Sequence, residues 1–88
     1  MGRYYFYIIY SSRIDQYYIG SSNDPQIRLE HHNKSKKGWT MRGRPWILKF
    51  SKPFATKQEA QSWERKIKSQ KRRDIIEMII NNKFQWIK

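Results

Sequence analysis

One carboxylate lies in an otherwise apolar helical stripe. The spacing i, i+3, i+4 and i+7, by which a helix turns one face toward a core, is occupied by Ala60, Trp63, Glu64 and Ile67. An ionised Glu on such a face costs free energy unless it is paired or binds a cation, so Glu64 is a candidate cation ligand. Its spacing to Lys68 fits an ordinary i,i+4 ion pair equally well. The pattern leaves both interpretations open.

A second constellation combines a guanidinium with imidazoles. Arg28 precedes His31 and His32 by three and four residues, so the three side chains share a helical face. The planar fork of Arg28 matches two phosphate oxygens and stays charged, and a neighbouring His can hydrogen-bond a phosphate or move a proton. A solvated basic face would show the same spacing. Metal ligation by the two His is not expected, because adjacent residues lie about 100° apart on a helix and no Cys or carboxylate cluster completes a site.

Two aromatic segments supply phenols. Tyr7 lies in the middle of residues 4–10, which are aromatic or aliphatic throughout, and Tyr18 lies within residues 16–19. If the two segments pair as a hairpin, the two phenols come close together. Core packing is the competing interpretation for each of them.

The charge balance indicates a polyanionic partner. Nineteen Lys and Arg residues oppose seven Asp and Glu residues, which gives a net charge of +12. Such an excess attracts nucleic acid, because each neutralised phosphate releases counterions. Aromatic side chains between cations can stack on bases, although a solvated face is the alternative for any one run of charge. The cations cluster in two segments, which are Lys34, Lys36, Lys37, Arg42 and Arg44 with Trp39 among them, and Lys66, Lys68, Lys71, Arg72 and Arg73.

Length and composition narrow the class of protein. The chain has 88 residues and no Cys, which predicts one domain, residues 1–88, without disulfides or a thiolate zinc site. No segment has the apolar length of a membrane span or a secretory signal, so we expect a soluble, cytoplasmic protein with no membrane partner. Neither a small-molecule cofactor nor a particular protein partner is indicated. The tail residues Phe84, Trp86 and Ile87 are expected to pack on their own domain, with docking on a partner as the alternative.

Local signals define the elements that must position these residues. Residues 4–10 are apolar at every position, which predicts a strand covered on both faces. Apolar runs and turn residues give the order β-β-α-β-α-α. This order predicts an α/β (α+β) fold with a small three-stranded antiparallel sheet flanked by helices. The strands are expected at residues 4–10, 16–19 and 46–51, and the helices at residues 25–33, 56–70 and 72–82.

Caps and chain breakers set the expected boundaries. Asp24 and Pro25 fit the N-cap and first position of a helix. The spacing of Thr56 and Glu59 matches a capping box, which also explains Glu59 without a chemical role. The other expected boundaries are Gly20 at the end of the second strand, a basic loop at residues 34–45, Pro53 after the third strand, and Asn81 and Asn82 as helix C-caps.

Four ordered motifs, spread over about residues 4–75, resemble the GIY-YIG nucleases, most closely the short stand-alone bacterial members related to the nuclease domain of the excision-repair incision subunit. The first element reads Tyr-Phe-Tyr and lacks the initial Gly, and Ser21 stands where some relatives have Lys. The motifs are Tyr5 to Ile9 followed by Tyr18-Ile19-Gly20, similar to the paired GIY and YIG elements; Arg28 to Asn33, similar to the Arg and His-Asn helix; Thr40 to Trp46, similar to the loop before the third strand; and Glu59 to Lys68, similar to the helix with the metal-binding Glu.

The resemblance implies a metal-dependent DNA endonuclease acting on duplex or branched DNA, in repair or recombination. Glu64 would then hold one Mg²⁺, or Mn²⁺, and Arg28 would stabilise the attacked phosphate. Tyr18, Tyr7 or His32 would act as general base. A non-catalytic nucleic-acid-binding module on the same fold is the alternative, and a structural role in a nucleoprotein assembly is a third. The residues expected to contact DNA are Gly20, with room for the substrate beside its backbone, Lys34, Lys36, Lys37, Trp39, Arg42, Arg44 and Lys68.

Overall fold

The fold is built on a three-stranded antiparallel sheet. A computed structural model describes residues 3–34 and 38–87 of the chain. Strand β1 (Tyr4–Ser11) lies in the centre, between β2 (Gln16–Ser22) and β3 (Ile47–Phe54). Both neighbours run antiparallel to β1, and a bulge interrupts the β1–β3 register between Ile8 and Ile9. The predicted sheet and fold class are confirmed.

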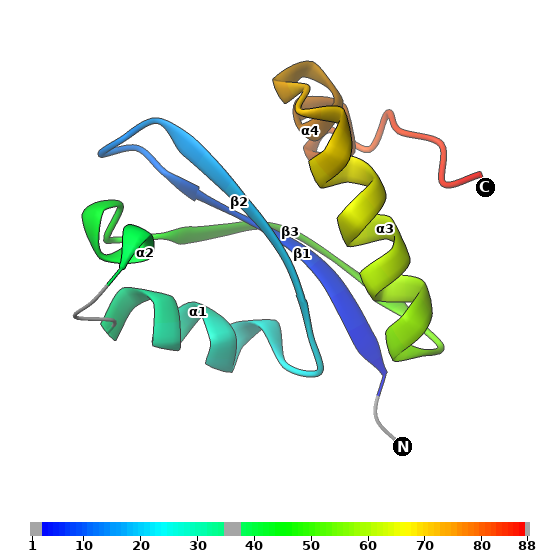
Figure 1. Cartoon of the computed structure of the whole chain (residues 1–88), viewed down its shortest axis with the longest axis horizontal. Coiled ribbons are helices and arrows are strands. Elements are labelled where there is room, and N and C mark those ends of the chain that lie inside the picture. Colours follow the sequence, from blue (N-terminus) through cyan, green and yellow to red (C-terminus); the bar gives the residue numbers. More distant parts are fainter. Residues whose placement is uncertain (1–2, 35–37, 88) are drawn as a thin grey trace.

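Helices cover both faces of this sheet (Figure 1). Helix α1 (Pro25–Lys34) lies on one face, and α3 (Lys57–Gln70) and α4 (Arg73–Ile80) lie on the other. Residues 6–9 of β1 are at most 1% exposed, so the strand expected to be covered on both faces is covered on both faces. The core beneath α3 and α4 contains Phe6, Ile8, Ile19, Trp63, Ile67 and Ile79. The core beneath α1 contains Tyr7, Ile9 and Trp46.

Side-chain caps fix two of the helices as the sequence indicates. Asp24 Oδ1 accepts hydrogen bonds from the backbone N–H groups of Gln26 and Ile27, at 3.1 and 3.2 Å. Thr56 Oγ1 accepts one from the backbone N–H of Glu59, at 3.1 Å. Each bond satisfies a donor that a helix N-terminus leaves unpaired, so α1 and α3 begin at defined residues.

Several expected boundaries are wrong. Strand β2 continues two residues beyond Gly20, to Ser22. Its pairing with β1 is made by backbone hydrogen bonds, which do not depend on a side chain at position 20. Pro53 lies inside β3 and does not close it, which an edge strand tolerates because one side of its ladder is unpaired. The short helix α2 (Trp39–Arg42) occupies part of the expected loop. Helix α4 ends at Ile80, two residues early.

The C-terminal tail packs on its own domain, as expected. The Trp86 ring stacks on Phe50 with centroids 5.9 Å apart and an interplanar angle of 9°. It also meets Trp63 edge-on at 5.1 Å, and Phe84 meets Trp63 at 5.9 Å. Ile87 alone of the three tail residues stays exposed, at 70%. The tail therefore closes the core beneath α3 and α4.

Candidate active site

The site begins at the β2 edge, where a Tyr lies over a Gly. Tyr7 pairs with Gly20 in the β1–β2 register. A Cβ atom at Gly20 would lie 2.5 Å from Tyr7 Oη and 2.6 Å from its Cζ, closer than atoms can approach. The absent side chain at Gly20 therefore makes room for the phenol of Tyr7, which extends across β2.

Tyr7 forms a buried pair with His32. The Tyr7 Oη and His32 Nε2 atoms are 3.3 Å apart, and the two residues are 1% and 9% exposed. Burial is the main cause that raises the pKa of Tyr7 well above its ordinary value, with a further contribution from Tyr18. Burial, followed by the charge of Arg28, lowers the pKa of His32. Near neutral pH the phenol thus keeps its proton and the imidazole is neutral, so that Tyr7 donates to Nε2 when His32 carries its proton on Nδ1.

The second phenol lies closer to solvent. Tyr18 is half-buried, and its ring centroid is 4.7 Å from that of His32. Lys68 Nζ lies 5.4 Å from the Tyr18 ring centroid, so a cation faces this ring. The hairpin brings Tyr7 and Tyr18 to the same imidazole, as the pairing of the two aromatic segments predicts.

Glu64 enters the site from α3 and is held by two partners. Ser21 Oγ donates to Glu64 Oε1 at 2.6 Å, and Lys68 Nζ donates to Oε2 at 2.8 Å. The Glu64 side chain is 21% exposed and that of Lys68 is 46% exposed. The ion pair allowed by the i,i+4 spacing is therefore present, and the hydrogen bond from β2 is additional. This carboxylate joins α3 to the sheet at the edge where the phenols lie.

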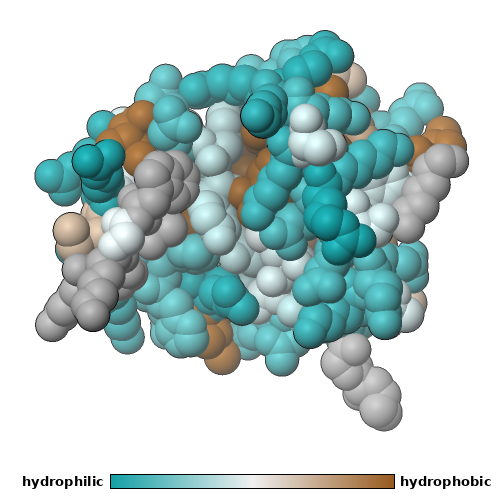
Figure 2. All heavy atoms as spheres, in the orientation of Figure 1, coloured by the Kyte–Doolittle hydropathy of each residue, from teal (hydrophilic) through white to brown (hydrophobic). Residues whose placement is uncertain are grey.

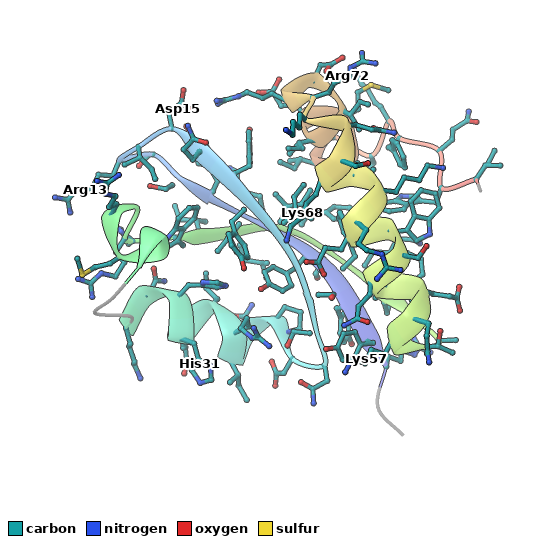
Figure 3. The ribbon with its side chains drawn as sticks, in the orientation of Figure 1. Arg13, Asp15, His31, Lys57, Lys68 and Arg72 are labelled. Atoms are coloured by element: carbon teal, nitrogen blue, oxygen red, sulfur yellow. The ribbon has the colours of Figure 1, made fainter. Side chains whose placement is uncertain are left out.

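Arg28 approaches from the opposite side, on α1. It is exposed, and its charge lowers the pKa of Tyr7 while the charge of Glu64 raises it. Both charges therefore act on the same phenol, one from α1 and one from α3. His31 points away from the sheet (Figure 3) and does not join this group. Of the five residues expected to carry the chemistry, Tyr7 and Tyr18 contact His32, whereas Arg28 and Glu64 act on Tyr7 through their charges.

The residues expected to contact DNA differ in their exposure and in whether they already have a partner within the chain. Lys34 and Arg42 are exposed. Arg44 is half-buried and donates from Nη1 to the backbone carbonyl of Asn33 at 3.3 Å, so it stabilises the end of α1. Lys68 is engaged by Glu64. Lys36, Lys37 and the side chain of Trp39 lie outside the described residues.

Two supporting residues, Asn33 and Ser21, have structural roles that the sequence does not indicate. The Asn33 side chain forms two hydrogen bonds with the backbone of Trp46. Its Nδ2 donates to the carbonyl at 3.1 Å, and its Oδ1 accepts from the N–H. It thereby ties the end of α1 to the start of β3. No local sequence pattern indicates this pair, because thirteen residues separate its members. Ser21 was noted only as a departure from relatives, whereas it orients Glu64.

The donor set at Glu64 suits a hard cation. The described residues contain no group of three or more His, Cys, Asp or Glu side chains that could hold a metal. Glu64 offers one carboxylate beside the hydroxyl of Ser21, both oxygen donors. Mg²⁺ keeps several waters and needs only one or two carboxylates together with substrate phosphate oxygens, so these residues fit it better than they fit Zn²⁺.

The fold and the site together define an α+β domain with phenols, an arginine and a carboxylate around one sheet edge, an arrangement suited to phosphate chemistry. The chain belongs to the GIY-YIG nuclease family, since the model of the GIY-YIG catalytic domain matches residues 3–81. It is 37% identical over 79 residues to a UPF0213 protein of Streptococcus pneumoniae serotype 4, and the match covers 89% of this chain and 79% of that relative. No solved structure matches the chain with significant similarity. Family membership indicates a nuclease.

Among residues 3–34 and 38–87, no helix is both long enough and apolar enough to cross a bilayer.

Proposed function

We propose that this chain is a divalent-metal-dependent endonuclease that hydrolyses a phosphodiester bond of duplex or branched DNA at the β2 edge. The observation that carries the proposal is that Ser21 of β2 holds Glu64 of α3 at 2.6 Å, next to Gly20, over which Tyr7 reaches His32 of α1 at 3.3 Å. Arg28 lies one helical turn before His32, so a scissile phosphate at this edge would meet the Glu64 carboxylate from α3 and the Arg28 guanidinium from α1. The net charge of +12 supports DNA as the partner.

Glu64 is the proposed protein ligand of the metal, Mg²⁺ or Mn²⁺. Its Oε1 atom is oriented by Ser21 and its Oε2 atom is held by the flexible, half-exposed Lys68. Lys68 can leave because an ion pair at such exposure contributes little, roughly 0.5 kcal/mol. A metal bound there would act as a Lewis acid and support the leaving oxygen. Ser21 would keep the carboxylate in place throughout.

Arg28 is proposed to bind the scissile phosphate. It is exposed and lies one helical turn before His32, so its guanidinium can reach a substrate outside the sheet edge. A planar guanidinium can donate two parallel hydrogen bonds to phosphate oxygens and stabilise the charge that develops on them during attack.

Activation of the attacking water is assigned to Tyr18 and His32, and Tyr7 is assigned to positioning His32. Tyr7 is almost fully buried and its raised pKa keeps it protonated, so it is a poor base for a water outside the sheet. Tyr18 is half-buried and its ring contacts the neutral His32. We therefore assign Tyr18 to orienting the attacking water and the neutral His32 beside it to accepting the proton that the water releases, while Tyr7 positions the His32 ring.

A non-catalytic DNA-binding module is the second candidate. The Lys68–Glu64 ion pair favours it, because this carboxylate already has a cationic partner in the chain. The two candidates make opposite predictions for cleavage and the same prediction for binding.

Nicking of supercoiled plasmid and of a branched oligonucleotide distinguishes the two. The wild type would be assayed with Mg²⁺ and with EDTA, beside Glu64→Ala and Arg28→Ala. Cleavage that requires the metal and is lost in both variants supports the endonuclease. Tight binding without cleavage by the wild type supports the binding module.

Two control variants make this assay specific. Arg65→Ala removes an exposed cation adjacent to Glu64 on α3, and Glu30→Ala removes an exposed carboxylate near Arg28 on α1. Both should retain cleavage. If the controls lose activity as fully as Glu64→Ala and Arg28→Ala, the assignment of the two residues is wrong.

A further inference from the structure

A hollow of about 310 Å³ lies beside the proposed active site, between the beginning of β2 and the α3–α4 junction. Its apolar lining includes Ile19, Ile67 and Ile76, and its aromatic lining includes Tyr17 and Tyr18. Figure 2 shows a small hydrophobic patch between β2 and α3 that is surrounded by hydrophilic surface. The volume falls at the lower end of the range typical of small-ligand pockets.

Cations surround the opening of this hollow. Lys68, Lys71, Arg72 and Arg73 all line it. Figure 3 shows Lys68 projecting from α3 toward the strands and Arg72 at the far end of that helix. The Arg73 guanidinium carbon lies 5.0 Å from the Tyr17 ring centroid, so a cation also covers one wall. An apolar floor with a basic rim suits a ligand that combines a flat base with a phosphate.

The rim cations differ in how far they are already neutralised. Arg72 pairs with Asp74 at 2.6 Å, and Arg73 pairs with Asp15 at 2.7 Å. Within the described part of the chain, Lys71 forms no ion pair. Lys71 is the left-handed C-cap of α3, with φ 51° and ψ 39°, so its position is set by the end of that helix. It is the rim cation most available to an external anion.

The hollow and the proposed active site share two residues. Tyr18 lines the hollow and also contacts His32. Lys68 lines the hollow and also holds Glu64. A strand whose phosphate lies between Arg28 and Glu64 would therefore bring a neighbouring nucleotide to this opening.

We propose that the hollow is a subsite for one unpaired nucleotide next to the scissile phosphate, with its base on the Tyr17 side of the floor and its phosphate on Lys71. The nucleotide must be unpaired, because a base stacked inside a duplex cannot enter a pocket without leaving its stack. The proposal rests on the proposed function for the location of the scissile phosphate. It adds a structural preference, for DNA with an unpaired nucleotide beside the cut.

Binding measured in EDTA tests the subsite independently of cleavage. Fluorescence anisotropy would compare a fully paired duplex with the same duplex carrying a short single-stranded flank. The wild type should bind the flanked DNA at least about fivefold more tightly, as expected for stacking of one base. Lys71→Gly should abolish most of this preference and lower the salt slope on the flanked DNA by about 0.7, the value for one single-strand phosphate.

The choice of variants separates this effect from charge and folding. Glycine suits the left-handed backbone at position 71, so Lys71→Gly removes the cation without straining the C-cap. Lys49→Ala removes one exposed cation from β3, the strand at the other edge of the sheet. The control should weaken binding to both DNAs equally and keep the preference for the flank.

A fluorescent base analogue reports on the floor of the hollow. 2-Aminopurine at the unpaired position should be quenched by the wild type and less by Tyr17→Leu, which keeps an apolar wall but removes the ring. Equal affinity of the wild type for paired and flanked DNA would overturn the subsite. A preference that survives both Lys71→Gly and Tyr17→Leu would also overturn it.

The two proposals fail separately. Metal-dependent cleavage without a flank preference would remove the subsite and leave the endonuclease. A flank preference that depends on Lys71, found in a protein that does not cleave, would leave the subsite as part of a DNA-binding module.

Discussion

Lys68 Nζ lies 2.8 Å from Glu64 Oε2, so the carboxylate proposed to bind the metal already has a cation from its own chain. The other carboxylate oxygen accepts a hydrogen bond from Ser21 at 2.6 Å. Ser21 comes from the sheet, whereas Lys68 comes from the same helix and is 46% exposed. Ser21 therefore orients Glu64, and the exposed Lys68 competes with an external cation.

Replacing Lys68 should strengthen metal binding in the absence of DNA. Lys68→Met removes the competing ammonium, and the affinity for Mn²⁺ alone, measured by electron paramagnetic resonance, should rise roughly two- to fivefold, the value of a partly exposed ion pair. Lys66→Met is the matched control, because Lys66 lies on the same helix and packs over Trp63 at 5.1 Å. Equal metal affinity in the wild type and Lys68→Met would show that Lys68 does not occupy the cation position.

His32 should make the protein less stable in mild acid. Its pKa is lowered in the folded state, mainly by burial, from an ordinary value of 6.5. Below about pH 6.5 the unfolded chain takes up a proton that the folded chain resists, so the free energy of unfolding should fall with pH until the lower folded pKa is reached. Above about pH 7.5, where the unfolded His is deprotonated as well, this residue should contribute no pH dependence.

Urea unfolding between pH 5 and pH 8 measures this effect. His32→Gln should flatten the acid side of the profile, whatever its stability at pH 8. The exposed His31→Gln is the control and should keep the wild-type slope. If the wild type and His32→Gln lose stability in parallel as the pH falls, burial of His32 is not the cause.

Gly20→Ala should destabilise the protein through Tyr7. The new methyl group would lie 2.5 Å from Tyr7 Oη, and overpacking of this kind costs about 1–3 kcal/mol in the free energy of unfolding. The same substitution in a Tyr7→Leu background should cost much less, because the ring is gone. Additive effects of the two substitutions in a double-mutant cycle would contradict the proposed contact.

Arg42 and Arg44 should behave differently although they are neighbours in one basic cluster. Arg42 is exposed, so Arg42→Gln should lower the slope of log affinity against log salt for duplex DNA by about 0.9, with little change in stability. Arg44 donates to the Asn33 carbonyl, so Arg44→Gln should cost about 1 kcal/mol of stability. A reversed pattern would show that Arg44 is the phosphate contact.

The sequence predicts local features well and long-range contacts poorly. The caps at Asp24 and Thr56 were found because each depends on residues at most three positions away. The order of strands and helices was also found, since each apolar run has its own period. The Ser21–Glu64 hydrogen bond spans 43 residues, and no local pattern encodes it.

Two other differences show the same limit. Gly20 was expected to end a strand and to give room to substrate, but its space is taken by Tyr7 from the neighbouring strand. Arg44 was counted with the DNA-binding cations, but its half-buried guanidinium caps a carbonyl at the end of α1. In both cases the residue type predicts what the residue can do, such as leave space or donate hydrogen bonds. Which neighbour takes the space or accepts the bond is decided by tertiary packing.

The most direct test of the proposed endonuclease asks whether the Glu64 carboxylate is needed for cleavage and not for DNA binding. Glu64→Gln keeps the size of the side chain and one acceptor oxygen but removes its charge, and Glu59→Gln makes the same change five residues earlier on α3. All three proteins would be assayed on one labelled DNA, for binding in EDTA and for cleavage in Mg²⁺. We predict that all three bind, that the wild type and Glu59→Gln cleave, and that Glu64→Gln does not. Cleavage by Glu64→Gln at the wild-type rate would contradict the account.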